Sequence, residues 1–405
     1  MDRRAFLAGL AASGALGAAG RPSRPRRSQT VVTGRAAVRT QAYGLTVGAA
    51  APVPIGVATG QTLASYDATT RGLVLDSIVS HGGRWCREVI VWAEVQSVNS
   101  STFDWTKWDA IITDCNSRNL KMIAVIGSSP VWARPTTYAS GDSTSPPDSA
   151  STFGTFCAAA ATRYSSSIKH WEIWNEPNLK QFWGGVGASF GTDPIHFAAM
   201  QSAAYDAIKG VDSTATVISG GLGSAETTGG YTAPIDFIDT MLDQGIGSKL
   251  DGIGVHPYTY SVLPDSTFYD HIWRQMYLTT PSMKSVMEDH SVGNLKFWLT
   301  EFGAPTNGPG PAGTVANNYG ISIYPPLPAW VDEQVQAQQF TTAITLARAR
   351  PDLFANFMAW TLLDSEAPGT LTDREKHFGI LEMDGTPKDA SAAFTAAINA
   401  TGGPA

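Results

Sequence analysis

Eight short apolar runs recur along the 405-residue chain, and their number constrains the fold more than any other feature of the sequence. Each run is short and apolar enough to be a parallel strand that is buried on both faces. In chain order, the runs are Pro54–Ala58, Arg84–Trp92, Lys121–Ile126, His170–Trp174, Ala215–Ser219, Gly252–His256, Lys296–Thr300 and Asn356–Trp360.

Segments with helical periodicity separate these runs. Apolar residues lie on one helical face in Leu75–Val79 and Trp108–Ile112, and the pattern returns in Phe156–Tyr164, Phe197–Ile208, Phe237–Leu242, Val335–Leu346 and Ala390–Ile398. Eight strands that alternate with helices are typical of a closed barrel, whereas open doubly wound sheets usually have about five or six strands. We therefore predict that residues 41–405 form a single α/β domain, a (β/α)8 TIM barrel.

The first 40 residues differ in composition from the rest of the chain. Arg3 and Arg4 precede an apolar stretch of small residues that runs to Gly20, as in twin-arginine export signals. Residues 1–40 contain eight Arg, no Lys and one acid. We expect them to be a twin-arginine-type signal peptide and basic leader, and the protein to be secreted or held in the cell envelope. An uncleaved anchor is the alternative, but Ala8–Gly20 is short for a bilayer span.

The charge of the remaining chain limits its partners. The full sequence has 28 basic and 35 acidic residues, and residues 41–405 keep 20 and 34 of them, a net charge near −14. This balance argues against nucleic acid and, after signal cleavage, against an anionic membrane surface. It suits a soluble secreted enzyme with a neutral substrate, which we expect to be a monomer. The chain has three cysteines, Cys86, Cys115 and Cys157, and they lack the close spacing of a metal or redox motif. The spacing leaves open whether two of them form a disulfide.

Two carboxyl groups stand at the ends of predicted strands. Glu176 ends the fourth strand and Glu301 ends the seventh, so both side chains can reach the barrel mouth, where the carboxyl ends of the strands meet. Retaining hydrolysis of a glycosidic bond needs such a pair. One carboxylate attacks the anomeric carbon, and a neutral carboxyl about 5 Å away protonates the leaving oxygen.

Other residues are expected to set the charge states of this pair. Arg87 and Tyr258 are the hydrogen-bond donors that we place beside Glu301, which would keep it ionised. Burial and a negative neighbour would raise the pKa of Glu176. Glu172 lies deeper in the fourth strand and is expected to pair with an Arg inside the barrel. Arg87 could equally be that partner.

The residues around both glutamates resemble known motifs. The run 171–179, WEIWNEPNL, resembles the strand-four acid/base motif of clan A glycoside hydrolases, and Thr300–Gly303 resembles their strand-seven nucleophile motif. This resemblance implies that Glu176 is the acid/base and Glu301 the nucleophile of a retaining TIM-barrel enzyme. It also implies that Asn175 binds the sugar 2-hydroxyl, that His256 and Tyr258 flank the nucleophile, and that Trp360 forms an aromatic platform under the sugar.

Within the clan, the runs 174–183 and 129–133 are most similar to family 39, which contains β-xylosidases and bacterial exopolysaccharide endoglycosidases. Family 5 is the second most similar. Trp132 and, more weakly, Trp183 are further candidates for stacking on a sugar ring. The expected activity is hydrolysis of β-linked oligo- or polysaccharides by double displacement, without a metal or other cofactor.

Other functions share parts of this pattern. A transglycosylase would share the glycosyl-enzyme intermediate, and a barrel that only binds sugar would not need the intact carboxyl pair. The run 187–191, GASFG, matches a serine esterase elbow with Ser189 as nucleophile, but a polar loop precedes it where the elbow needs a strand. The run 220–223, GGLG, lacks the third glycine of a dinucleotide loop, and no His-Glu-x-x-His metal motif occurs.

Two long segments without helical pattern are expected to shape the binding site, Thr136–Thr152 after the third strand and Thr306–Pro328 after the seventh.

Overall fold

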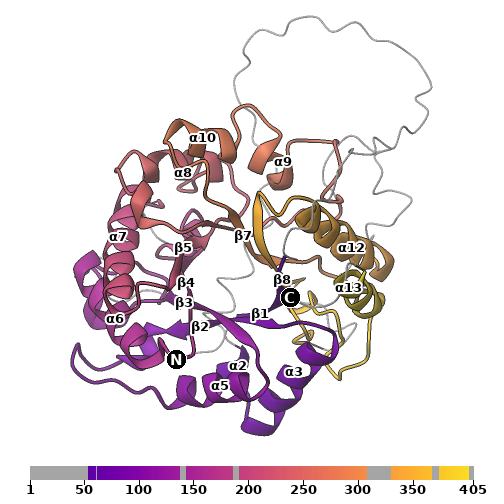
Figure 1. Ribbon diagram of the computed structural model, residues 1–405, viewed down its shortest axis with the longest axis horizontal. Helices are drawn as coiled ribbons and strands as arrows, with labels where there is room; N and C mark the ends of the chain where they lie inside the picture. Colours follow the sequence, from indigo (N-terminus) through magenta and orange to yellow (C-terminus); the bar gives the residue numbers. More distant parts are fainter. Residues whose placement is uncertain are drawn as a thin grey trace, which may run out of the picture.

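The computed structural model describes residues 53–60, 62–136, 143–185, 191–307, 330–366 and 374–400. They form a ring of parallel strands surrounded by helices (Figure 1). The strands are β1 (Ile55–Gly60), β2 (Trp85–Val91), β3 (Lys121–Gly127), β4 (His170–Asn175), β5 (Thr216–Gly221), β6 (Ile253–Val255), β7 (Phe297–Phe302) and β8 (Phe354–Trp360). All eight predicted strands are present, and the (β/α)8 barrel is confirmed.

The order of the strands closes the ring. Neighbours follow the series β5-β4-β3-β2-β1-β8-β7-β6, and all of the pairs are parallel. Parallel bridges from Ile218 to Gly252 and from Leu222 to Val255 join β5 to β6. The carboxyl ends of β4 and β7 therefore lie at the same end of one barrel.

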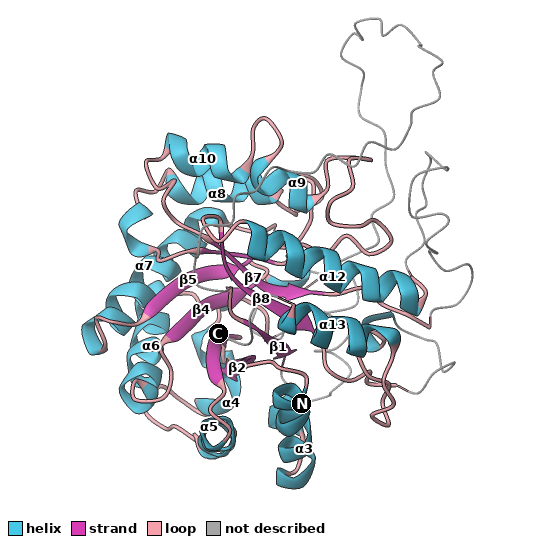
Figure 2. Ribbon diagram, turned by 45° about the vertical axis from the view of Figure 1, so that its right-hand side comes forward, coloured by secondary structure: helices cyan, strands magenta, loops and turns pink. Residues whose placement is uncertain are grey.

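Helices form the outer layer of the barrel (Figure 2). The longer ones are α3 (Ala68–Ser80), α5 (Thr106–Ser117), α6 (Ala150–Tyr164), α7 (Pro194–Val211), α8 (Pro234–Leu242), α12 (Glu333–Ala349) and α13 (Asp389–Asn399). Each covers one of the helical patterns predicted above. The shorter α2 (Thr62–Ser65), α4 (Trp92–Val95), α9 (Ile272–Tyr277) and α10 (Met283–Asp289) were not predicted.

Local sequence explains where the helices start. At α7, Asp193 accepts hydrogen bonds from the Ile195 and His196 amides, and Pro194 occupies the first helical turn. Both are typical of a helix N-terminus, because the first amides have no partner within the helix. Asp67 and Asp332 cap α3 and α12 in the same way.

The alternation of side chains along the strands creates two cores. Residues that face outward pack against the helices in one large cluster, which includes Cys86 and Cys115. Residues that face inward fill the barrel, and they include Trp85, Ile218 and Trp298. Such filling is expected of an eight-stranded barrel, whose interior is packed with side chains.

The inward side chains lie in layers. Trp85, His170 and Trp298 form an aromatic layer, with ring centroids 4.5 to 6.5 Å apart. Two residues further along β2 and β4 come Arg87 and Glu172, which form a polar layer between the aromatic residues and the barrel mouth. This aromatic layer lies on the amino-terminal side of the polar layer, so the polar layer is the one nearer the carboxyl ends of the strands.

Several sequence-based expectations concern the outside of the barrel. The three cysteines are free and buried, and the Sγ atoms of Cys86 and Cys115 are 3.5 Å apart. Residues 1–40 lie outside the described residues, so the signal peptide stays a prediction. Within the described ranges, no helix is both long and apolar enough to cross a membrane.

Candidate active site

The end of β4, which carries Asn175 and Glu176, has an irregular backbone. Trp174 and Glu176 have φ values of 69° and 40°, in a region that residues other than glycine rarely occupy. The Glu176 amide donates to the Gly221 carbonyl at 3.0 Å, which ties this turn to the end of β5. Backbone strain of this kind costs on the order of 1–3 kcal/mol and is typical of functional sites.

A second irregularity occurs at the end of β7. The pairing of β7 with β8 shifts register between Leu299 and Phe302. Strict alternation would turn consecutive residues to opposite faces. The shift instead lets Thr300 and Glu301 both contact residues of the barrel interior, since Thr300 bonds Glu172 and Glu301 bonds Arg87.

Arg87 connects the polar layer to the barrel mouth. Its Nε and Nη2 donate to the two carboxylate oxygens of Glu172 at 2.6 and 3.1 Å. Nη1 donates to Glu301 Oε1 at 2.5 Å, and Nη2 also donates to Asn175 Oδ1 at 2.9 Å. The two roles proposed from the sequence, structural partner of Glu172 and donor to Glu301, are therefore filled by the same guanidinium.

His256 brings the two candidate catalytic carboxyls together. Its Nδ1 atom is 3.0 Å from Glu176 Oε1 and 3.5 Å from Glu301 Oε2. The two oxygens are thus at most about 6.5 Å apart, the sum of these distances. Tyr258 donates its hydroxyl to Glu301 Oε2 at 2.8 Å. The predicted pair is therefore in one site, and its flanking residues are in place.

The surroundings of the two carboxyls raise their pKa values to different extents. Burial and the negative charges of Glu301 and Glu375 raise the pKa of Glu176 well above its usual range. Burial also raises the pKa of Glu301, but the charge of Arg87 and the Tyr258 hydrogen bond oppose this effect. Glu301 is the easier of the two to ionise, so Glu176 keeps its proton longer.

The donors beside Glu301 keep fixed charge states themselves. Burial lowers the pKa of Arg87, but the charges of Glu172 and Glu301 outweigh burial and raise it above its usual value. Burial and the charge of Glu301 raise the pKa of Tyr258 well above its usual range, so its hydroxyl stays a donor. Burial and the charge of Arg87 keep the pKa of His256 well below its usual range, so its ring is neutral.

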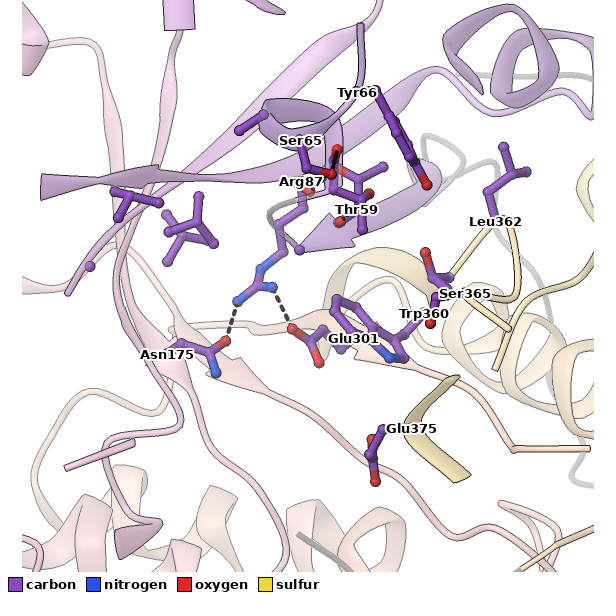
Figure 3. Close-up of a pocket in the computed structure, with 18 of the residues that line it drawn as sticks. Thr59, Ser65, Tyr66, Arg87, Asn175, Glu301, Trp360, Leu362, Ser365 and Glu375 are labelled. Carbon is purple, nitrogen blue, oxygen red and sulfur yellow. Dashed lines mark hydrogen bonds and ion pairs between the residues drawn. The ribbon is translucent and has the colours of Figure 1, made fainter. Parts of the chain in front are cut away.

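A cavity of about 700 Å³ opens beside Glu301 (Figure 3). Arg87, Asn175, Glu301 and Trp360 line it, together with residues that follow β1, β3 and β8. Figure 3 shows Arg87 extending from β2 to both Asn175 and Glu301. This volume lies within the range of about 300–1,000 Å³ that is usual for small-ligand sites. Glu176, His256 and Tyr258 are not among the residues that line the cavity; His256 and Tyr258 contact Glu301, and Glu176 contacts His256.

The aromatic candidates fall into two groups. Trp360 lines the cavity, and Gly60 leaves room for its ring, because a Cβ at Gly60 would lie 2.7 Å from a Trp360 ring carbon. Trp132 is not among the lining residues; its Nε1 donates to the Gln96 carbonyl at 2.7 Å and its ring packs on Trp92. Trp183 is buried in the outer core. Among the three, only Trp360 is placed to contact a ligand in this cavity.

The structure adds residues that the sequence did not single out for this site. Thr300 bonds Glu172 and His256, and Glu375 lines the cavity from the segment after β8. A side chain at Gly221 would collide with His256, and one at Gly223 would collide with Glu176. The glycines were visible as the GGLG run, but their role depends on neighbours from other strands. No local signal marks Glu375.

Some sequence-based candidates lie elsewhere. Ser189 lies outside the described residues, as do 137–142 and 308–328 from the two long segments. One group in the described part of the chain, Asp239, Asp243 and His290, has the spacing of metal ligands, with ligand atoms within 4.8 Å of one another. It lies at the C-terminal ends of the outer helices α8 and α10 rather than at the strand ends that carry the carboxyl pair.

No family model and no curated protein matches the sequence. Solved structures do match. A family 39 glycoside hydrolase from Bacteroides cellulosilyticus WH2 is 20% identical, with a TM-score of 0.61 over 85% of this chain and 63% of its own. A monomeric β-xylosidase from Caulobacter crescentus CB15 is 17% identical, with a TM-score of 0.55 over 85% of this chain and 68% of its own. GH5_18 from Streptomyces cattleya, solved with GlcNAc, is 16% identical, with a TM-score of 0.55 over 88% and 82%.

These likenesses establish a common barrel fold. They agree in fold with the resemblance to families 39 and 5 that the strand-four and strand-seven motifs carry. The chain spans 63% of the length of the Bacteroides enzyme.

Proposed function

We propose that this protein is a retaining glycoside hydrolase that cleaves β-linked glycosides of oligo- or polysaccharides. The observation that carries the proposal is the carboxyl pair, whose two members both contact His256 Nδ1. Retaining enzymes place their carboxyls about 5–5.5 Å apart and inverting enzymes about 6.5–9.5 Å apart. One oxygen of each carboxyl lies within about 6.5 Å of the other through His256, at the lower limit of the inverting range, and this supports the retaining class.

In the first step of the proposed mechanism, Glu301 attacks the anomeric carbon while Glu176 donates its proton to the leaving oxygen. Arg87 and Tyr258 hold both oxygens of Glu301 and keep it ionised and oriented. The raised pKa of Glu176 supplies the proton near neutral pH.

In the second step, water attacks the glycosyl-enzyme ester and Glu176 takes up a proton from that water. The covalent bond to Glu301 breaks and the sugar leaves with its original anomeric configuration. Neither step needs a metal, so turnover is expected to persist in a chelator.

The cavity favours a neutral sugar. The charged residues on its lining are the acidic Glu94, Glu301, Asp364 and Glu375 and the basic Arg87, Lys107 and Lys376. Ion pairs engage most of these charges, among them Glu94–Lys107, Glu301–Arg87, Asp364–Lys388 and Glu366–Lys376. Trp360 offers an apolar face for a pyranose or furanose ring. Asn175, whose Oδ1 is held by Arg87, keeps its amide as a donor for a sugar hydroxyl.

The proposal extends to the site of action. The paired arginines and the basic leader in residues 1–40, with the acidic remainder of the chain, support export to the medium or the cell envelope.

The deciding experiment is a screen of aryl β-glycosides and β-linked polysaccharides, with NMR detection of the anomer first released. We expect the β-anomer first. First release of the α-anomer would refute the retaining mechanism. In Glu301→Ala turnover should be lost, whereas Glu176→Ala should still react with an activated aryl glycoside and then release the sugar slowly. Wild-type rates in both variants would refute the assignment.

An added sugar acceptor separates hydrolysis from glycosyl transfer. Both reactions share the glycosyl-enzyme intermediate, so the ratio of free sugar to transfer product decides. We expect free sugar to dominate. A barrel that only binds sugar would release nothing in either assay.

A further inference from the structure

His256 contacts a different partner with each ring nitrogen. Nδ1 lies 3.0 Å from Glu176 Oε1 and 3.5 Å from Glu301 Oε2, and Nε2 lies 3.1 Å from Thr300 Oγ1. The ring is fully buried and neutral, so only one nitrogen carries a hydrogen. If that nitrogen is Nδ1, His256 donates to Glu176, and if it is Nε2, His256 accepts from Glu176. The two cases have opposite effects on the acid.

Thr300 decides between them. Its hydroxyl has one hydrogen and lies 3.1 Å from Glu172 Oε1. Arg87 and the Gly221 amide also donate to this oxygen, at 3.1 and 2.8 Å, as expected for an ionised carboxylate. A carboxylate only accepts, so the Thr300 hydrogen points at Glu172. Thr300 then presents only lone pairs to His256, and Nε2 must carry the ring hydrogen.

We propose that His256 is a positioning residue for the acid/base. Hydrogen bonds from Thr300 to Glu172 and from His256 to Thr300 hold the ring as the Nε2–H tautomer, so that Nδ1 accepts a hydrogen bond from the protonated Glu176 carboxyl. The proposal rests on the function proposed above and deepens it. The orientation of a histidine by the partner of its second nitrogen is a general device in protein sites.

The end of β5 is shaped to hold this arrangement. A Cβ at Gly221 would overlap His256 Nε2 and would lie 2.8 Å from Thr300 Oγ1. A Cβ at Gly223 would lie 2.8 Å from Glu176 Oε1. Asn178 fixes Gly223 from both sides, accepting from its amide at 3.0 Å and donating to its carbonyl at 2.8 Å. The GGLG run thus gives space to the histidine and to the acid.

The tautomer matters for both steps of the reaction. A bond from Glu176 to a bare Nδ1 exists only while Glu176 is protonated, so it stabilises the acid before the first step. After Glu176 has given its proton to the leaving oxygen, its carboxylate faces the Nδ1 lone pair. This contact makes it a stronger base toward water in the second step.

The other groups around Glu176 do not replace this contact. The negative charges of Glu301, Glu375 and Glu172 act in the same direction on its protonation, and Arg87 opposes them. Tyr258 gives its hydrogen to Glu301. His256 is the side chain that bonds the Glu176 carboxyl among the described residues.

The tautomer can be observed without any activity assay. We would label the protein with ¹⁵N-histidine, assign His256 by its loss in His256→Gln, and read its ring nitrogens by long-range ¹H–¹⁵N correlation. A protonated Nε2 and an unprotonated Nδ1 are expected. A protonated Nδ1, or both nitrogens protonated near neutral pH, would overturn the proposal.

Thr300 variants provide the kinetic test. Thr300→Val removes the acceptor from Nε2 and frees the ring to donate from Nδ1 to Glu176. Such a donor favours the ionised form of Glu176, so the apparent pKa on the basic side of the kcat/KM profile should fall by about one unit. Thr300→Ser keeps the hydroxyl and should restore the wild-type pKa. Thr216→Val, at the other end of β5, is the matched control and should not shift it. An unchanged basic-side pKa in Thr300→Val would refute the proposal. If this variant does not fold, the ¹H–¹⁵N spectrum of the wild type decides alone.

The two proposals fail in different ways. A protonated Nδ1 in an enzyme that needs both Glu176 and Glu301 would refute the tautomer and leave the glycosidase. A protonated Nε2 in a protein that releases no sugar from any glycoside would refute the glycosidase, and with it the catalytic meaning of the tautomer.

Discussion

Arg87 and Glu88 are neighbours on β2 and equally buried, each 1% exposed, yet they face opposite sides of the barrel wall. Arg87 points inward and pairs with Glu172 and Glu301 beside a cavity. Glu88 points outward, and no ion pair in the described part of the chain involves it; its neighbour is the Thr59 hydroxyl at 2.7 Å. Burial raises the pKa of Glu88 to about 8 despite that hydrogen bond, so it is mostly neutral at pH 7.

The comparison shows what a buried charge requires. Inside the barrel, several carboxyls surround one guanidinium, and ionised groups persist because each has a partner. Between barrel and helices, a single carboxyl without a cation gives up its charge instead. Depth alone therefore does not mark a functional residue, and an ionised network open to a cavity is the better sign.

Removal of the inner cation should have the largest effect. Arg87→Met leaves Glu172 buried without a cation and Glu301 without one of its donors, so we expect kcat to fall about 10³-fold or more and stability to fall by about 3–5 kcal/mol. Arg87→Lys keeps the charge but not the forked geometry, and should recover stability more than kcat. Urea unfolding and kcat measure the two effects. Unchanged kcat in Arg87→Met would remove Arg87 from the site.

The outer carboxyl should show the reverse behaviour in Glu88→Gln. The pKa of Glu88 is raised on folding, so the stability that the neutral acid contributes is complete below about pH 4.5 and is lost as pH rises toward 8. Glutamine cannot ionise, so Glu88→Gln should match the wild type near pH 4 and exceed its stability by a few kcal/mol at pH 8.

Urea unfolding at the two pH values tests this prediction, with Glu94→Gln as the control because Glu94 is only half-buried and is paired with Lys107. A constant difference between Glu88→Gln and the wild type at both pH values would mean that Glu88 is ionised in the folded protein. The kcat of Glu88→Gln should stay near that of the wild type, since Glu88 faces away from the cavity.

The same inner and outer distinction separates two tryptophans. Trp360 lines the cavity, so Trp360→Ala should raise KM about tenfold through loss of the apolar face beneath the sugar. Trp132 packs on Trp92 away from the lining residues, and Trp132→Ala should change KM by less than about twofold. Equal rises in KM would place both rings at the substrate.

These residues show how far sequence reasoning reaches. The strand runs and their terminal residues sufficed for the barrel and for the meeting of Glu176 with Glu301, because parallel strand ends share one face. The direction of a side chain after a strand end was not readable, and so Trp132 and Trp360 looked alike. A strict alternation would also have turned Thr300 and Glu301 to opposite faces, and only the register shift in β7 brings both inside.

Other features depended on partners that are distant in sequence. Thr300 and Gly221 acquire their meaning from Glu172 and His256, which belong to other strands. The neutral state of Glu88 follows from the helices that cover it, since its charge cannot be judged from the alternation along β2. Such effects arise from desolvation and from contacts across strands, which a pattern along one segment does not contain.

The smallest effect is expected at the opposite end of β4, where Lys169 Nζ lies 2.6 Å from Asp212 Oδ2. The Lys169 hydrogen bond lowers the pKa of Asp212 to about 2, so this pair stabilises the fold above the ordinary Asp pKa and less as pH falls toward 2. The lysine is 48% exposed, however, and solvent screens the pair. Lys169→Met should therefore cost less than about 1 kcal/mol at pH 7 in urea unfolding. If Lys169→Met lost as much unfolding free energy as Arg87→Met, an exposed pair and a buried network would contribute alike. Burial would then not determine how much a charge pair stabilises this barrel.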